Sequence, residues 1–301
     1  MQVDFLAIGE LLTDVTTTEY TTDLSQARKF EIYQGGSPAN VAANLCFMGK
    51  KALIVGCVGD DGFGRFLLKE LRSIGLSDEH IQINKSLATS VIFVTRSKET
   101  PEFVAYRMAD KEIRKPKKQL IQNAKILHTT AFALSLQPAR AVILKAMKSA
   151  KKGGSAISVD WNYAPAIWGE DNGKNVFREV MQLNPLLKIS LDDLSRFLGE
   201  RTIDEYKIYL DKFVFHTICI TCGKDGVWYK KSGKDWKFKD TLAVENVVDT
   251  TGAGDAFWAG FISAYLDKSD VEKCVDNALQ TAAEKIQRKG PLYNNSQEIT
   301  S

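Results

Sequence analysis

Short apolar runs alternate with amphipathic segments along most of the chain. The first run, Val3 to Ile8, ends at Gly9 and is typical of a buried strand in a parallel sheet. Residues 38–49 follow a helical period, with Pro38 at the start and Gly49 at the end. Strands that alternate with helices predict a mainly parallel sheet with helices on both faces. Further strands are predicted at Ala52 to Val58, Ile126 to Thr129, Ala156 to Val159, Leu186 to Ser190 and Ile218 to Cys222, and further helices at Phe63 to Ile74, at Ala139 to Lys151 and from Asp255.

Two separated segments have a different pattern, in which side chains alternate as in half-exposed strands. One contains Phe30 to Tyr33 after a threonine-rich stretch. The other contains the runs Ser90 to Thr95 and Phe103 to Arg107, joined by a turn with Lys, Glu and Pro, as in a hairpin. We therefore predict a small sheet formed by residues 16–34 and 89–108, beside a large α/β domain of residues 1–15, 35–88 and 109–301.

The composition argues against several classes of protein. The 301 residues are 44% hydrophobic, and 40 basic against 37 acidic residues leave a net charge of +3. Charges so balanced and so dispersed predict no nucleic-acid-binding surface. Five cysteines without regular spacing predict a reducing compartment rather than a disulfide framework. Neither a signal-peptide pattern nor a run of about 18 apolar residues is present, so we predict a cytoplasmic protein that does not enter a membrane.

The segment from Asp249 to Asp255 is the strongest local feature, because Gly252, Ala253 and Gly254 lead directly into an apolar helix. N–H groups at the start of a helix lie at the positive end of its dipole and favour anion binding. The Asp255 carboxylate can accept a proton from an attacking hydroxyl while these N–H groups hold a transferring phosphoryl group. Taken alone, the segment is equally consistent with a tight turn and a helix cap.

A second glycine-rich place is Gly35 and Gly36, where the missing side chains let a ligand approach the backbone. Asn40 follows and can offer a donor and an acceptor to a pair of hydroxyls. Taken alone, the segment also fits a strand-to-helix turn in which Asn40 is solvated or caps the helix. We expect a loop at Glu10 to Asp14, where open α/β sheets bind ligands. No Gly-Lys pair is followed by Ser or Thr, which excludes a Walker loop, and the residues after the first strand lack the glycine spacing of a dinucleotide site.

Together these pieces resemble the ribokinase-like, or PfkB-type, carbohydrate kinases over almost the whole chain. The resemblance rests on four ordered motifs: Gly9 to Asp14 with Gly35 to Ala42, then Gly56 to Gly64, Thr221 to Gly226, and Asp249 to Asp255. Further segments are similar to the fructokinase group: Phe103 to Arg107 before Ala109-Asp110, Ala131 to Arg140, Asp160 to Tyr163, and Lys188-Ile189-Ser190 before Asp193. The resemblance implies a ribokinase-like three-layer α/β/α domain and a small β-sheet lid that closes over a sugar.

The resemblance also implies roles for individual residues. Asp255 is expected to be the general base, and Gly252, Ala253 and Gly254 to form the anion hole for the γ-phosphate of ATP. The sugar is expected to contact Asp14, Gly35, Gly36, Asn40, Arg107 and Asn162. The nucleotide is expected to contact Ser190, Thr221, Gly223 and Gly226. Mg²⁺ is expected to arrive with ATP, with Asp193 near its water shell, and a monovalent cation such as K⁺ is expected beside Asp249 and Thr251. The chain is expected to be a monomer or a homodimer.

The predicted activity is that of an ATP-dependent fructokinase, which converts D-fructose and ATP into fructose 6-phosphate and ADP. Ala164 stands where the family often has Arg, so a kinase for 2-keto-3-deoxygluconate or another ketose or sugar acid stays open. A catalytically retired sugar-binding or regulatory protein is a third reading, which the intact Asp255 disfavours. Cys219 and Cys222 have zinc-site spacing but fall on a predicted strand, where they point to opposite faces, so we predict core cysteines.

Overall fold

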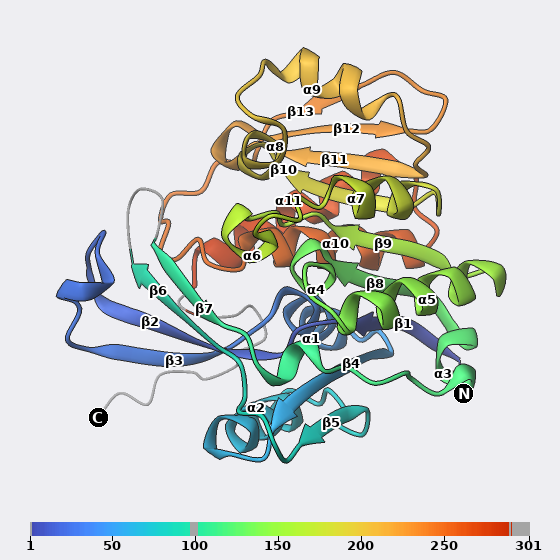
Figure 1. Cartoon of the computed structure of the whole chain (residues 1–301). Coiled ribbons are helices and arrows are strands. Elements are labelled where there is room, and N and C mark those ends of the chain that lie inside the picture. Colours follow the sequence, from blue (N-terminus) through green and yellow to red (C-terminus); the bar gives the residue numbers. More distant parts are fainter. Residues whose placement is uncertain (1, 97–101, 289, 291–301) are drawn as a thin grey trace.

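The apolar runs form a nine-stranded sheet in the computed structural model, which describes residues 2–96, 102–288 and 290 (Figure 1). Its strands are β1 (Val3–Ile8), β4 (Ala52–Gly59), β5 (Ile81–Asn84), β8 (Ala124–Thr130), β9 (Ala156–Asp160), β10 (Leu186–Ser190), β11 (Thr217–Thr221), β12 (Val227–Lys231) and β13 (Lys237–Lys239). Their order is β13-β12-β11-β10-β9-β8-β1-β4-β5. All neighbours from β11 to β5 pair in parallel, whereas β12 and β13 add to the edge in antiparallel pairs. The predicted mainly parallel sheet is confirmed.

Helices cover both faces of this sheet because successive side chains of a strand point to opposite sides. In β1, Leu6 and Ile8 belong to one apolar core, and Phe5 and Ala7 to the other. One core is covered by α1 (Ser37–Phe47), α2 (Gly62–Ser73), α10 (Ala253–Leu266) and α11 (Val271–Ile286). The other is covered by α3 (Lys118–Gln122), α4 (Ala131–Leu134), α5 (Ala139–Lys152), α6 (Pro165–Trp168), α7 (Lys174–Met181), α8 (Leu191–Leu198) and α9 (Ile203–Leu210). The three predicted layers are present.

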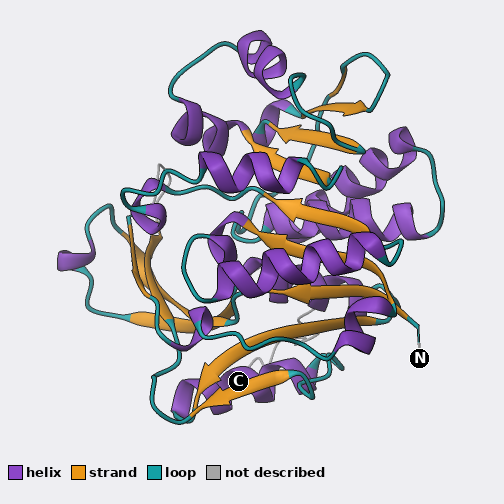
Figure 2. Cartoon of the chain, turned by 45° about the vertical axis from the view of Figure 1, so that its right-hand side comes forward, coloured by secondary structure: helices purple, strands orange, loops and turns teal. Residues whose placement is uncertain are grey.

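A separate four-stranded sheet projects from the large one, on the side toward which the arrows of β8, β9 and β11 point (Figure 1), and the turned view separates the two sheets (Figure 2). Its strands, in the order β3-β2-β6-β7, are β2 (Leu12–Tyr20), β3 (Phe30–Gly35), β6 (Val91–Arg96) and β7 (Phe103–Tyr106). The predicted pairing of the last two is confirmed, since β6 and β7 are antiparallel. The predicted turn between them falls largely on residues 97–101, outside the described residues.

The loop expected at Glu10 to Asp14 is shorter than predicted. Strand β2 already begins at Leu12, which pairs with Gly35 of β3, so Asp14 lies within a strand. The threonine-rich continuation alternates between buried and part-exposed side chains, a pattern that suits a half-buried strand. The small sheet therefore brings Asp14 to the large domain on a strand and not on a loop.

Two further expectations concern membranes and cysteines. Among the described residues, none of the helices has the length and apolar character that crossing a bilayer requires. Cys219 is buried in β11 and Cys222 is part-buried just after it, and all five cysteines are free thiols. The same part of the chain contains no group of three or more His, Cys, Asp or Glu side chains that could hold a metal ion. Cys219 is thus a core cysteine, as predicted, whereas Cys222 is only partly buried.

Candidate active site

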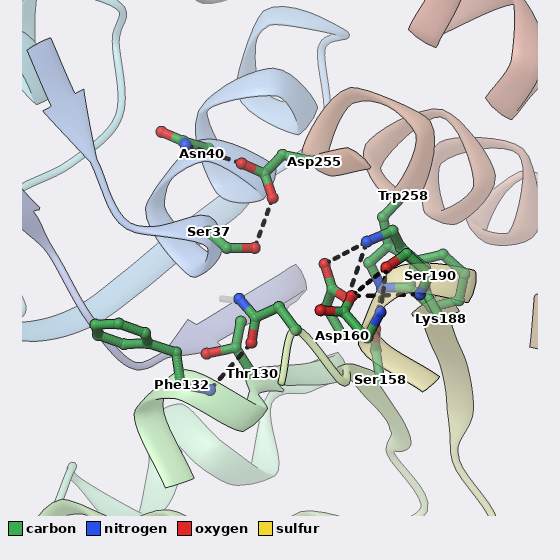
Figure 3. Close-up of polar contacts among 12 residues, drawn as sticks. Ser37, Asn40, Thr130, Phe132, Ser158, Asp160, Lys188, Ser190, Asp255 and Trp258 are labelled. Carbon is green, nitrogen blue, oxygen red and sulfur yellow. Dashed lines mark hydrogen bonds and ion pairs between the residues drawn. The ribbon is translucent and has the colours of Figure 1, made fainter. Parts of the chain in front are cut away.

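The predicted site residues gather where the central parallel strands end. Thr130, Asp160 and Ser190 are the last residues of β8, β9 and β10, and Asn162 follows β9 by two positions. Helices α1 and α10 also begin at this edge, and their first turns are in direct contact (Figure 3). Carboxyl ends of parallel strands lie at one edge of a sheet, which explains why residues far apart in the sequence meet here.

Asp255 lies in the first turn of α10 and is held by two residues from the first turn of α1. The Ser37 hydroxyl donates to Asp255 Oδ1 at 2.6 Å, and Asn40 Nδ2 donates to Asp255 Oδ2 at 2.9 Å (Figure 3). Desolvation raises the pKa of Asp255 to about 6, although the hydrogen bond from Ser37 opposes the change. A carboxylate with this pKa is ionised at neutral pH and is still basic enough to receive a proton.

The backbone before Asp255 turns sharply into the helix. Gly252 has a φ of 75°, in the left-handed region that favours glycine, and it caps α10 without a side-chain hydrogen bond. The N–H group of Ala253 donates to the Thr250 carbonyl at 3.1 Å, so the turn itself uses this predicted anion-hole donor. Gly254 and Asp255 follow in the first helical turn, whose N–H groups have no partner within a helix. This end of α10 is suited to bind an anion.

A buried ion pair lies directly against the same helix end. Lys188 and Asp160 are only 5% and 2% exposed, and Lys188 Nζ lies 2.9 Å and 2.8 Å from the two carboxylate oxygens of Asp160. Burial alone would lower the pKa of Lys188, but the carboxylates of Asp160 and Asp193 outweigh it and raise the pKa above its usual value. A Cβ added to Gly254 would lie 3.1 Å from Lys188 Nζ. The ammonium therefore sits beside the anion-binding turn.

Asp14 occupies the space over Gly35, the last residue of β3. A Cβ on Gly35 would lie 2.4 Å from the Asp14 carboxyl carbon, so any larger residue would displace that side chain. Gly36 has a φ of 100°, and a Cβ there would lie 2.4 Å from the Glu10 carbonyl oxygen. Desolvation, with repulsion from the Asp255 carboxylate, raises the pKa of Asp14 to about 7. The two carboxyl groups thus share one site.

Arg107 reaches the site but is already paired. Its Nε donates to Asp110 Oδ2 at 2.9 Å, and its Nη1 donates to the Phe132 carbonyl at 2.9 Å and to the Ser135 hydroxyl at 2.6 Å. The guanidinium carbon lies 3.9 Å from the centre of the Phe132 ring. Asn162 Oδ1 accepts a hydrogen bond from the Phe132 N–H at 3.0 Å. Asp110 therefore balances the charge of Arg107, which stays a predicted sugar contact.

The residues predicted to contact the nucleotide lie on the next strands of the sheet. Ser190 and Thr221 are register partners at the ends of β10 and β11, and Gly223 and Gly226 have φ values of 56° and 121° in the turn that follows. Ser190 caps α8, because its hydroxyl donates to Asp193 Oδ2 at 2.5 Å and accepts from the Asp193 N–H at 3.0 Å. Asp193 Oδ2 is thereby engaged, and the residue stays a predicted neighbour of the water shell of Mg²⁺, whose direct ligands the ATP phosphates would supply.

Asp249, one of the two expected monovalent-cation ligands, is also engaged. Lys285 Nζ donates to the Asp249 carbonyl at 2.8 Å and lies 3.2 Å from Asp249 Oδ2, and the Thr251 N–H donates to Asp249 Oδ1 at 3.0 Å. These oxygens do not fit a separate cation while a side-chain ammonium contacts them.

Three contacts of the site were not predicted from the sequence. Ser37 belongs to the glycine-rich motif that contains Gly35 and Gly36. The only sequence signal for its contact with Asp255 was its position before a predicted helix. Lys188 carries a clearer signal, because a lysine in the middle of an apolar strand needs a buried partner. The pattern of polar and apolar residues along α11 gives no sign that Lys285 is buried.

The chain was also compared with known proteins. The family model described as "pfkB family carbohydrate kinase" matches residues 3–298. An ATP-dependent 6-phosphofructokinase of Thermoanaerobacterium thermosaccharolyticum is 35% identical over 300 residues, covering 97% of this chain and 90% of the relative. A probable fructokinase-2 of Arabidopsis thaliana is 32% identical over 273 residues, covering 88% of this chain and 82% of the relative.

A solved structure gives the same result for the fold. The fructokinase of Halothermothrix orenii superposes with a TM-score of 0.83 at 33% identity, covering 93% of this chain and 98% of that one. The predicted ribokinase-like architecture, a large mainly parallel sheet between helices with a small separate sheet, is confirmed.

Proposed function

Because the chain belongs to the PfkB family of carbohydrate kinases and is a phosphotransferase acting on a sugar hydroxyl, we propose that its substrate is D-fructose. ATP is the phosphoryl donor, and the products are fructose 6-phosphate and ADP. The observation that carries this proposal is that two cations of the candidate site, Arg107 and Lys188, are already paired. Arg107 is paired with Asp110, and Lys188 with Asp160.

A sugar acid or a sugar phosphate would need a cation to replace the water around its own charge. Ala164 lacks the charged side chain that the resemblance leads us to expect there. The groups nearest Asp255 are the neutral Ser37 and Asn40, which suit hydroxyls. The fructokinase names of the Arabidopsis relative and of the Halothermothrix structure support the same substrate.

The proposed reaction uses the contacts of Asp255. The carboxylate removes the proton of the primary hydroxyl, whose oxygen then attacks the γ-phosphorus as the bond to ADP breaks. The N–H groups at the start of α10 hold the charge of the transferring group. Asp14, Gly35, Gly36, Asn40, Arg107 and Asn162 border the sugar, and Ser190, Thr221, Gly223 and Gly226 border the nucleotide. The small sheet of β2, β3, β6 and β7 forms a lid that excludes water.

The 6-phosphofructokinase name of the Thermoanaerobacterium relative favours a second candidate, fructose 6-phosphate. A panel of D-fructose, fructose 6-phosphate and 2-keto-3-deoxygluconate, with ADP release as the measurement, separates the candidates. We expect kcat/KM for fructose to exceed the other two by about 100-fold or more, since unpaired charge is poorly accommodated. A higher kcat/KM for either anion would replace fructose as the substrate, and no turnover of any sugar would contradict the kinase proposal.

The pH profile should report on Asp255. The pKa of about 6 means that the base loses activity as the pH falls through 6, because the carboxyl becomes protonated. Ser37→Ala removes a hydrogen bond that favours the ionised form, so the acidic limb of the kcat/KM profile should move to higher pH. Ser73→Ala, at the exposed end of α2, is the control and should leave the profile in place. An unchanged limb in Ser37→Ala would assign the titration to another group, such as Asp14.

A further inference from the structure

Lys285 is a second buried cation near the anion-binding turn, in addition to Lys188. It stands in the last turn of α11, is 1% exposed, and directs its ammonium at the carbonyl and carboxylate of Asp249. The N–H groups of Thr251 and Gly290 bind the same carboxylate, at 3.0 Å and 3.2 Å. One positive charge and several donors thus converge on the residue that opens the loop before α10.

The contact connects α11 to the loop that leads into the predicted anion hole. The backbone N–H groups of Val248 and Asp249 donate to the Ile286 carbonyl at 2.8 Å and 3.2 Å, next to Lys285 in the chain. A Cβ on Gly252 would lie 4.0 Å from Lys285 Cε. The lysine stem therefore packs close to the turn, and its head fixes the loop three residues earlier. Movement of this ammonium would move the backbone that ends at Asp255.

We propose that the ammonium of Lys285 replaces the monovalent cation that the resemblance implies, so that this chain orders its anion-binding loop without added K⁺. The ammonium carries the charge of K⁺, has a similar size, and already contacts the Asp249 oxygens that were expected to bind the ion. The inference rests on phosphoryl transfer at α10 but not on which sugar is the acceptor. Lys285 acts here as a positioning residue, because it works through the loop.

Two variants separate the charge from the space it fills. Lys285→Ala removes the charge and leaves room for an ion at the Asp249 oxygens. Lys285→Met removes the charge but keeps most of the stem, and so leaves little room. Lys273→Ala is the matched control on α11, because Lys273 is exposed on the same helix.

Each protein is studied in KCl and in tetramethylammonium chloride at equal ionic strength. The readouts are ATP affinity by calorimetry, the melting temperature, and kcat from ADP quantified by chromatography. For the wild type and for Lys273→Ala, we expect kcat and ATP affinity each to differ by less than about twofold between the two salts. Lys285→Ala should lose about tenfold in kcat and in ATP affinity in tetramethylammonium, equivalent to 1.4 kcal/mol, and should recover in KCl. Lys285→Met should lose as much kcat and ATP affinity in tetramethylammonium, and it should not recover in KCl.

Activation of the wild type by K⁺ of about tenfold or more would overturn the proposal, and so would a Lys285→Ala variant that is equally active in both salts. If Lys285→Ala does not fold in either salt, the wild-type comparison and Lys285→Met decide the question. ATP affinity needs no sugar, so failure of the fructose assignment would leave these results intact.

Discussion

Asp255→Asn is expected to lower kcat for the sugar by about 10²- to 10⁴-fold, the usual contribution of a general base. Asparagine has the same shape but cannot accept the hydroxyl proton at neutral pH. The variant should remain folded, because desolvation disfavours the ionised carboxylate that it removes. Its melting temperature should therefore be equal to or above that of the wild type. The measurements are steady-state kinetics at saturating ATP, thermal unfolding, and calorimetric ATP binding.

The matched control is Asp267→Asn, at the opposite end of α10. Asp267 is 62% exposed, pairs with Lys50, and lies far along the helix from the site. This change should leave kcat unaltered, since an exposed ion pair contributes little. If Asp255→Asn retained near-normal turnover while binding ATP normally, Asp255 would not be the base. Asp14, whose carboxyl is coupled to Asp255, would then be the next candidate.

Local pattern was sufficient to predict most of the architecture. The run that became β4 has no polar side chain, and those that became β1 and β10 are apolar except at Asp4, Lys188 and Ser190. Such runs are the signature of a central parallel strand, which is buried on both faces. The glycine turn before Asp255 was equally visible, because the left-handed φ of Gly252 demands that residue type. Both signals lie within a few neighbouring residues.

The contacts that join distant segments were not predictable in the same way. Lys188 and Asp160 are 28 positions apart and meet only because β9 and β10 are neighbours with these residues in register. The sequence pattern predicts both strands but not their order in the sheet. Arg107 and Asp110 are only three residues apart, yet the sequence pattern did not predict that they pair.

The Lys188 and Asp160 pair is the second place where a large effect is expected. Lys188→Met should lower the free energy of unfolding by about 3–5 kcal/mol, because it leaves a buried carboxylate without a partner. The double variant with Asp160→Asn removes both charges and should recover most of that loss, since neutral replacements of buried pairs are often tolerated. Urea titration measures these differences. Lys237→Met breaks the exposed pair with Glu272 and should cost less than about 1 kcal/mol.

In the Lys188 and Asp160 variants, kcat should not recover together with the free energy of unfolding. Lys188 Nζ lies beside the Gly254 position, and its charge lowers the pKa of Asp255, against the larger effect of desolvation. A positive charge at this helix end also stabilises charge on a transferring phosphoryl group. We therefore expect the double variant to unfold near the wild-type urea concentration while kcat stays about 10²-fold or more below normal. A double variant that regained both would mean that the pair only supports the fold. Recovery of stability alone would instead place the Lys188 and Asp160 pair in the electrostatics of transfer, because the two missing charges would then be the remaining difference at the start of α10.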